Sequence, residues 1–231
     1  MNHNPVIVAL DFDSADGARA LVERLGSSVD FYKVGMELYA AAGMTFVREL
    51  MDSGKKVFLD LKLYDIGETV KRAVAVVAHS GVRFLTVHGS ESIMRAAAEG
   101  RGGSDLKLLA VTVLTNFTQK DLGELGYQTS VADLVALRVR SAIACGIDGI
   151  VCSPLEAEAV RSIVGPKTIL VTPGVRSRGA DVGDQKRVAT PAEAIAAGAD
   201  YLVIGRQVTR AAEPKAEVEK IGVELESAVL R

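Results

Sequence analysis

The stretch Val57-Phe58-Leu59-Asp60-Leu61-Lys62 begins as an apolar run and continues into alternating charged and apolar residues. A short apolar run of this kind is typical of a buried parallel β-strand. Successive side chains of a strand point to opposite faces, so Asp60 and Lys62 are predicted on one face and the neighbouring leucines on the other. The stretch therefore predicts a buried strand that presents an acid and a base side by side.

Similar apolar runs recur along the chain, separated by segments long enough for a helix. Three of these segments, residues 15–25, 69–79 and 132–144, carry apolar residues at helical spacing. Several segments open with residues that commonly cap helices, namely Ser14, Ser90, Ser130 and Thr190. With the opening stretch, eight runs are predicted as strands: residues 6–10, 31–34, 57–60, 84–87, 108–113, 149–152, 169–171 and 201–204.

Eight such alternations within 231 residues predict an α/β fold, a closed (β/α)8 TIM barrel. An open doubly wound sheet normally uses fewer strands for this length. We expect one catalytic domain over residues 1–231. Because active sites of such barrels lie at the C-terminal ends of the strands, the residues that follow each strand are the first candidates for function.

Composition and charge exclude several classes of protein. With 27 basic and 29 acidic residues, the chain has no positive excess for binding a nucleic-acid backbone. The N-terminal residues lack the features of a signal peptide and no apolar run has membrane-spanning length, so we expect a cytoplasmic protein without a membrane partner. Cys145 and Cys152 stand in apolar surroundings, and neither a disulfide nor a metal site is expected.

Polar or charged residues close most of the predicted strands. One interpretation is a ring of functional groups at the barrel mouth, and the alternative is that strand ends simply become polar where they reach solvent. The residues concerned are Asp11, Lys33, Asp60 with Lys62, His88, Thr115, Ser153, Thr172, and Gly205 with Arg206.

The third strand favours a functional interpretation. Asp65 follows Asp60 and Lys62 closely, and Lys33 ends the neighbouring strand, so the four side chains are candidates for an alternating array of two carboxylates and two ammonium groups. A structural ion-pair network is the alternative. Flanking carboxylates favour the charged form of Lys62, which suits proton donation and stabilisation of negative charge rather than Schiff-base formation.

A second group of residues is suited to binding phosphate. Thr172-Pro173-Gly174-Val175-Arg176 follows the seventh strand and Ile204-Gly205-Arg206 follows the eighth, where barrels commonly bind phosphate. Gly205 permits close approach of the backbone, and Arg206 can bind phosphate oxygens in bidentate fashion.

Together these segments resemble the orotidine 5'-phosphate decarboxylase family over essentially the whole chain. Asp60-Leu61-Lys62-Leu63-Tyr64-Asp65-Ile66-Gly67-Glu68-Thr69 fits the family signature Asp-x-Lys-x-x-Asp-[Ile/Val]-x-x-Thr. Further matching segments are Val8-Ala9-Leu10-Asp11, Tyr32-Lys33-Val34-Gly35, Thr172-Pro173-Gly174-Val175-Arg176, Gly183-Asp184-Gln185 and Gly205-Arg206.

The resemblance implies a carboxy-lyase that converts orotidine 5'-monophosphate to uridine 5'-monophosphate and CO2, the last step of de novo pyrimidine synthesis, without metal or organic cofactor. It assigns Lys62 as proton donor to C6 of the pyrimidine and places Asp60 near the departing carboxylate, with Lys33 and Asp65 completing the charged array. The remaining implied roles are ribose binding by Asp11 and Lys33, contact with the pyrimidine by Thr115, and phosphate binding by Gln185, Gly205 and Arg206, with Arg176 at the base of a loop that closes over the phosphate.

The resemblance further implies a homodimer with active sites at its interface. Asp65, Ile66 and Thr69 would then serve the partner's site. Two alternatives remain open at this point: a magnesium-dependent sugar-phosphate decarboxylase or aldolase-like synthase on a related barrel, and a non-catalytic phosphate- or nucleotide-binding protein.

Overall fold

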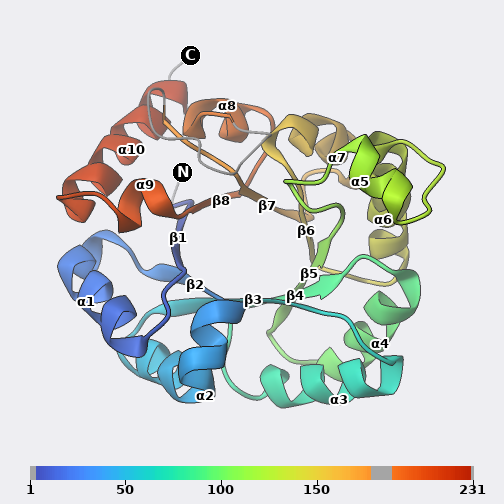
Figure 1. Cartoon of the computed structure of the whole chain (residues 1–231), viewed down its shortest axis with the longest axis horizontal. Coiled ribbons are helices and arrows are strands. Elements are labelled where there is room, and N and C mark those ends of the chain that lie inside the picture. The colour runs from blue at the N-terminus through green and yellow to red at the C-terminus, as the bar shows by residue number, and fades with distance from the viewer. Residues whose placement is uncertain (1–3, 178–188, 230–231) are drawn as a thin grey trace.

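Eight parallel strands form a closed barrel in a computed structural model that describes residues 4–177 and 189–229. The strands follow chain order around the barrel, and β8 pairs with β1 to close it (Figure 1). This confirms the predicted (β/α)8 TIM barrel. The strands are β1 Val6–Leu10, β2 Phe31–Gly35, β3 Lys56–Leu63, β4 Phe84–His88, β5 Lys107–Val111, β6 Gly149–Val151, β7 Ile169–Pro173 and β8 Tyr201–Ile204.

Helices surround the barrel on its outer side (Figure 1). The predicted helix over residues 15–25 is found with the same bounds. The helices predicted over 69–79 and 132–144 are also found, and their observed bounds differ from the predicted ones by at most two residues. Within the described ranges, no helix is long and apolar enough to cross a membrane. The helices are α1 Ala15–Leu25, α2 Met36–Asp52, α3 Gly67–Ala78, α4 Glu91–Arg101, α5 Gln119–Glu124, α6 Val131–Ala144, α7 Ala157–Val164, α8 Pro191–Ala196, α9 Arg206–Thr209 and α10 Pro214–Val229, with short 3-10 turns at Gly26–Ser28 and Pro154–Glu156.

Three of the four predicted helix caps act through their side chains. The hydroxyl groups of Ser14, Ser130 and Thr190 each accept a hydrogen bond from a backbone N–H in the first turn of their helix. Ser90 occupies the N-cap position of α4 but makes no such bond. Its hydroxyl group lies 2.7 Å from His88 Nδ1 instead, so Ser90 takes the predicted N-cap position without a hydrogen bond from its side chain to the helix.

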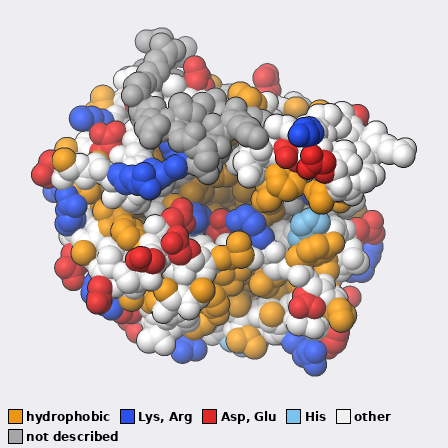
Figure 2. All heavy atoms as spheres, in the orientation of Figure 1, with side chains coloured by type: hydrophobic (Ala, Val, Ile, Leu, Met, Phe, Trp, Pro, Cys, Tyr) orange, Lys and Arg blue, Asp and Glu red, His pale blue; other side chains and the backbone are white. Residues whose placement is uncertain are grey.

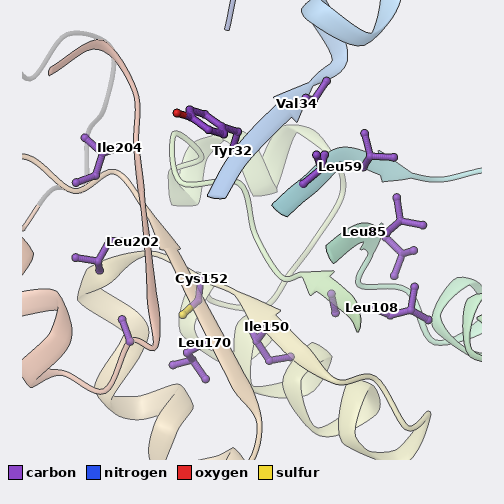
Figure 3. Packing of buried hydrophobic residues seen from close by; sticks show 14 of the residues in the cluster. Tyr32, Val34, Leu59, Leu85, Leu108, Ile150, Cys152, Leu170, Leu202 and Ile204 are labelled. Carbon is purple, nitrogen blue, oxygen red and sulfur yellow. The ribbon is translucent and has the colours of Figure 1, made fainter. Parts of the chain in front are cut away.

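The larger hydrophobic core lies between the barrel and the helices. It takes alternate residues of the strands, such as Val6, Val8 and Leu10 of β1, together with the inner faces of the helices. Figure 3 shows side chains of this core along the strands from β2 to β8. Burial of this apolar surface on both sides of the sheet explains why the strands read as nearly continuous hydrophobic runs.

A smaller core fills the barrel interior. Phe31, Phe58 and Phe84 are buried there. The Phe84 ring contacts the rings of Phe31 and Phe58 in tilted or edge-on arrangements, and Tyr201 packs against Phe31 and Phe84. Above these rings the interior is lined by smaller residues: Ala9, Val111, Val151 and Val203. Large side chains therefore close the lower part of the barrel, and small ones leave space beneath its C-terminal mouth.

Strand β3 is longer than predicted and carries an irregularity at its C-terminal end. Its pairing with β4 joins Leu59 to Leu85 and Leu63 to Val87. Between these two pairs β3 moves forward by four positions in the sequence and β4 by only two. The additional residues include Lys62, whose φ of 49° is the one positive value among the described non-glycine residues. The strand therefore bulges where its charged residues emerge.

Candidate active site

A cavity of about 220 Å³ opens at the C-terminal ends of the strands. Figure 2 shows the molecule hollowed near the barrel centre, with basic and acidic side chains gathered beside the hollow. The lining of this cavity combines an apolar floor with charged residues at its margin. The lining residues are Ala9, Asp11, Lys33, Asp60, Lys62, Val111, Val113, Leu114, Thr115, Val151, Pro173, Gly174, Arg176, Val203 and Gly205. A concave apolar site with a few convergent polar groups is typical of small-molecule binding.

Four charged residues at the ends of β1, β2 and β3 form a network in this cavity: Asp11, Lys33, Asp60 and Lys62. Lys62 Nζ lies 2.8 Å from Asp60 Oδ1, and Lys33 Nζ lies 3.7 Å from Asp60 Oδ2. Lys33 Nζ also lies 2.8 Å from Asp11 Oδ1 at the end of β1. The predicted placement of Asp60 and Lys62 on one face of their strand is thus found, and Asp11 extends the network toward β1.

Burial and charge act in opposite directions on Asp60. Burial disfavours the ionised form, but the ammonium groups of Lys33 and Lys62 and hydrogen bonds from Lys62 and Thr86 outweigh it, so the pKa of Asp60 lies below its usual value. The carboxylate is accordingly ionised at neutral pH. Among the side chains of this network, Asp60 and Lys33 are 15% and 10% exposed and Lys62 is 33% exposed, so Lys62 is the more accessible cation.

Gly35 makes room for the network at the start of α2. A Cβ atom at this position would lie 2.9 Å from Lys33 Nζ and 3.2 Å from Asp11 Oδ1, which is too close for an unperturbed ion pair. The absence of a side chain at Gly35 therefore lets the Lys33 ammonium group pack between the carboxylates of Asp11 and Asp60.

A second, more polar cavity of about 390 Å³ adjoins the first and shares Ala9, Asp11, Arg176 and Gly205 with it. Arg206 lines this cavity from the first position of α9. Gly205 precedes it, and among the described residues a Cβ there would meet only Ala9 within 4 Å, at 3.8 Å, so no described side chain fills the space beside this glycine. The predicted phosphate-binding residues Gly205 and Arg206 thus adjoin the charged network.

Arg176 joins the two cavities. Its side chain is buried, its guanidinium group donates a hydrogen bond to the carbonyl oxygen of Val175, and its backbone N–H donates to Ala189. The other phosphate ligand that the resemblance implies, Gln185, lies outside the described residues, as do Gly183 and Asp184.

The residues assigned to a partner's site lie outside the cavity of their own chain. Asp65, Ile66 and Thr69 are exposed, and Ile66 is 76% exposed despite its apolar side chain. The Asp65 carboxylate accepts a hydrogen bond from the backbone N–H of Ile66 and forms no ion pair with another described residue. One chain therefore brings Lys33, Asp60 and Lys62 together but does not bring Asp65 to them.

Three polar residues at strand ends do not line either cavity. Ser153 caps a 3-10 turn, Thr172 is buried, and the His88 ring stacks on Tyr64 with centroids 4.2 Å apart. Burial, together with the nearby charge of Arg138, lowers the pKa of His88 to about 4. Ser153 and Thr172 are fully buried, so contact with solvent does not explain these polar strand ends either, and His88 serves as a neutral packing and hydrogen-bonding residue.

The structure also brings residues to the site that sequence reasoning missed. Glu37, Thr209 and Arg210 line the polar cavity, and Thr86 donates a hydrogen bond to Asp60 from the middle of β4. A polar residue inside the run Phe84-Leu85-Thr86-Val87 was the available signal for Thr86. Across the described ranges, no cluster of three or more His, Cys, Asp or Glu side chains is arranged to hold a metal ion.

Comparison with known proteins gives consistent matches over nearly the whole chain. Residues 4–221 match the model of the orotidine 5'-phosphate decarboxylase / HUMPS family. A relative from Rhodopseudomonas palustris (strain HaA2), named orotidine 5'-phosphate decarboxylase, is 54% identical over 96% of this chain and 95% of its own length. One from Bradyrhizobium diazoefficiens with the same name is 54% identical over 97% and 94%.

Solved structures agree with these relatives. The crystal structure of orotidine 5'-phosphate decarboxylase from Lactobacillus acidophilus superposes with a TM-score of 0.85 at 36% identity and covers 96% of this chain and 99% of that one. An uncharacterised conserved protein from Geobacillus kaustophilus superposes with a TM-score of 0.83 at 35% identity, covering 96% and 100%.

Proposed function

Because the chain belongs to the orotidine 5'-phosphate decarboxylase / HUMPS family, we propose that it converts orotidine 5'-monophosphate to uridine 5'-monophosphate and CO2. This is the last step of de novo pyrimidine synthesis, and we place it in the cytoplasm with the nucleotide pools it serves. The observation that carries the proposal is the Lys62–Asp60 pair, with 2.8 Å between Nζ and Oδ1, inside a cavity that adjoins Arg206.

Lys62 supplies the central chemical step. Loss of CO2 leaves an electron pair at C6 of the pyrimidine, which the ring delocalises poorly, so a cation already in place stabilises the developing charge. Lys62 meets this requirement because its ammonium group lines the cavity and is held by Asp60. It then transfers a proton to C6 and completes the product. No metal or organic cofactor takes part in this scheme.

Asp60 and Lys33 hold the charges around the reacting bond. Asp60 is ionised, and it fixes Lys62 on one side and Lys33 on the other. Repulsion between Asp60 and the substrate carboxylate raises the energy of the bound substrate as a secondary contribution. Asp11 and Lys33, paired at 2.8 Å at the cavity margin, are placed to bind the ribose hydroxyl groups, and Thr115 lines the cavity near the pyrimidine.

The phosphate occupies the polar cavity beside Gly205 and Arg206, with Arg176 at its boundary. An arginine can bind two phosphate oxygens at once, and binding energy gained there offsets the cost of desolvating the charged site. Gln185 is assigned to the same phosphate, although it lies outside the described residues. Substrate recognition is thus separated from the reacting bond.

A homodimer completes each site. Tyr64 and Ile66 are exposed apolar residues just beyond the C-terminal end of β3, and Asp65 between them is exposed as well. In the proposed dimer this surface is covered, and Asp65, Ile66 and Thr69 of one chain reach the site of its partner. Asp65 then becomes the second carboxylate beside Lys62.

Product analysis tests the proposal. Purified protein is incubated with orotidine 5'-monophosphate in excess chelator, and nucleotides and CO2 are quantified. We expect one uridine 5'-monophosphate and one CO2 for each substrate consumed. Activity that requires added magnesium would favour a metal-dependent decarboxylase or synthase, and nucleotide binding without turnover would favour a non-catalytic binding protein; either result overturns the proposal.

A further inference from the structure

Thr86 is a fully buried polar residue in the middle of β4, between apolar neighbours. Its hydroxyl group makes two short hydrogen bonds to the charged end of β3. The hydroxyl group accepts one from the backbone N–H of Lys62 at 2.9 Å and donates one to Asp60 Oδ1 at 3.0 Å, while the carbonyl oxygen of Leu59 is a longer, alternative acceptor at 3.5 Å. A single side chain therefore contacts both residues of the Lys62–Asp60 pair.

These bonds lie where β3 departs from regular geometry. The pairing of β3 with β4 shifts between Leu59 and Leu63, and Lys62 there adopts a positive φ of 49°. A non-glycine residue keeps such a conformation only where its surroundings impose it, and unusual conformations of this kind cluster at functional sites. Within the described part of the chain, the hydroxyl group of Thr86 is the partner of the Lys62 N–H.

We propose that Thr86 is a positioning residue that fixes the bulge of β3 and thereby directs both the Lys62 ammonium group and the Asp60 carboxylate into the cavity. Thr86 does not line the cavity itself, so it acts through these two residues and not on the substrate. The inference rests on the proposed function of Lys62. Its geometric part, the hold of Thr86 on the Lys62 backbone, stands independently of which reaction follows.

Thr86→Val tests the role, because valine keeps the shape and burial of the side chain and removes both hydrogen bonds. Misplacement of catalytic groups by about 1 Å costs on the order of 100-fold in rate, so kcat should fall by about that factor. KM should change much less than kcat, since Thr86 contacts neither Arg206 nor Asp11. Thr86→Ser retains the hydroxyl group and should restore most of kcat even where loss of the methyl group lowers the melting temperature.

Thr112→Val is the matched control. Thr112 is equally buried after the next strand, β5, but its hydroxyl group donates to the carbonyl oxygen of Val151 at 3.3 Å and contacts neither charged residue. This variant should keep kcat close to wild type. A drop in kcat for Thr112→Val as large as that for Thr86→Val would overturn the inference, because it would make loss of any buried hydroxyl group sufficient.

Hydrogen exchange of the Lys62 amide, followed by NMR, gives a readout that does not require activity. The amide should be protected in the wild type and in Thr86→Ser and should exchange faster in Thr86→Val. Unchanged protection and unchanged kcat in Thr86→Val would contradict the inference, as would a loss of kcat that serine fails to restore. If the wild type does not decarboxylate the nucleotide, the proposed function fails, while the exchange data still decide whether Thr86 holds Lys62.

Discussion

Arg206 and Lys62 lie in different parts of the candidate site. Lys62 lies in the cavity over the apolar floor of the barrel, whereas Arg206 lines the adjoining polar cavity. In the proposed mechanism Lys62 acts on the reacting bond, and Arg206 binds the phosphate, which is remote from that bond. Substitutions at the two positions should therefore have different kinetic signatures.

Arg206→Ala should reduce kcat/KM for orotidine 5'-monophosphate by about 100-fold, the loss expected for a hydrogen bond to a charged group. The same variant should act on orotidine, which lacks the phosphate, almost as the wild type does. Steady-state kinetics with both substrates measure the difference. Arg140→Ala, an exposed change on α6, is the control and should affect neither substrate. An equal loss with both substrates would rule out phosphate binding by Arg206.

His88 should make stability depend on pH. Burial lowers its pKa to about 4 in the folded protein, against 6.5 for the free side chain, so the unfolded chain binds more protons between these values. The free energy of unfolding should therefore fall as the pH is lowered from 6.5 toward 4. Allowing for partial solvent screening, the contribution between pH 7 and 5 is about 1 kcal/mol.

Urea unfolding of the wild type and His88→Asn at pH 7 and pH 5 measures this contribution. Asparagine keeps a hydrogen-bonding group near Ser90 and does not titrate, so the variant should lose less stability than the wild type on acidification. Parallel pH dependence in the two proteins would show that His88 is not responsible.

At the scale of elements, the close packing of α3 on α4 depends on one glycine. A Cβ atom at Gly100 would lie 2.2 Å from the carbonyl oxygen of Lys71, so even alanine would force the two helices apart. Gly100→Ala should lower the free energy of unfolding by about 1–3 kcal/mol, as overpacking does. Thermal or urea unfolding of the wild type and the variant measures this loss of stability.

Gly222→Ala in α10 is the matched control, because a Cβ there meets no described residue within 4 Å. In an open helical position alanine is favoured over glycine by about 0.5–1 kcal/mol. The two substitutions are chemically identical, but they should change the free energy of unfolding in opposite directions. Stabilisation by Gly100→Ala would refute the close approach of α3 and α4.

The elements show which features the sequence predicts and which it does not. Hydrophobic periodicity located eight strands and the bounds of α1, because burial on a fixed face leaves a repeating pattern. It ended β3 at Asp60, three residues early, because the charged residues that follow are held by a bulge and by Thr86 on another strand. Non-local contacts of this kind leave no periodic signal.

The same distinction applies to the site. Alternation along β3 predicted the placement of Asp60 and Lys62, and the end of β2 predicted Lys33. Proximity in sequence suggested that Asp65 joins them, yet within one chain Asp65 lies beyond the end of β3 at Leu63, is exposed and does not line the cavity. Thr86 escaped notice because a β-branched residue is ordinary in a strand interior.

For the whole molecule, the proposed division of each site between two chains has a direct test. Lys62→Ala and Asp65→Ala homodimers should each be inactive, but a mixed dimer contains one site with both residues intact. After mixing under conditions that exchange subunits, about a quarter of wild-type activity should return, since half of the dimers are mixed and each has one complete site. Assay after gel filtration measures it; no recovery despite exchange would place Asp65 outside the partner's site.

The most direct test of the central role of Lys62 is the ultraviolet absorbance of orotidine 5'-monophosphate after adding enzyme in excess chelator. The wild type should convert the orotate band to that of the uridine product. Lys62→Ala should slow this by about 1000-fold or more while keeping a wild-type circular dichroism spectrum, because the cation that stabilises the carbanion is gone. Near-normal decarboxylation by Lys62→Ala, or no absorbance change with the wild type, would contradict the account.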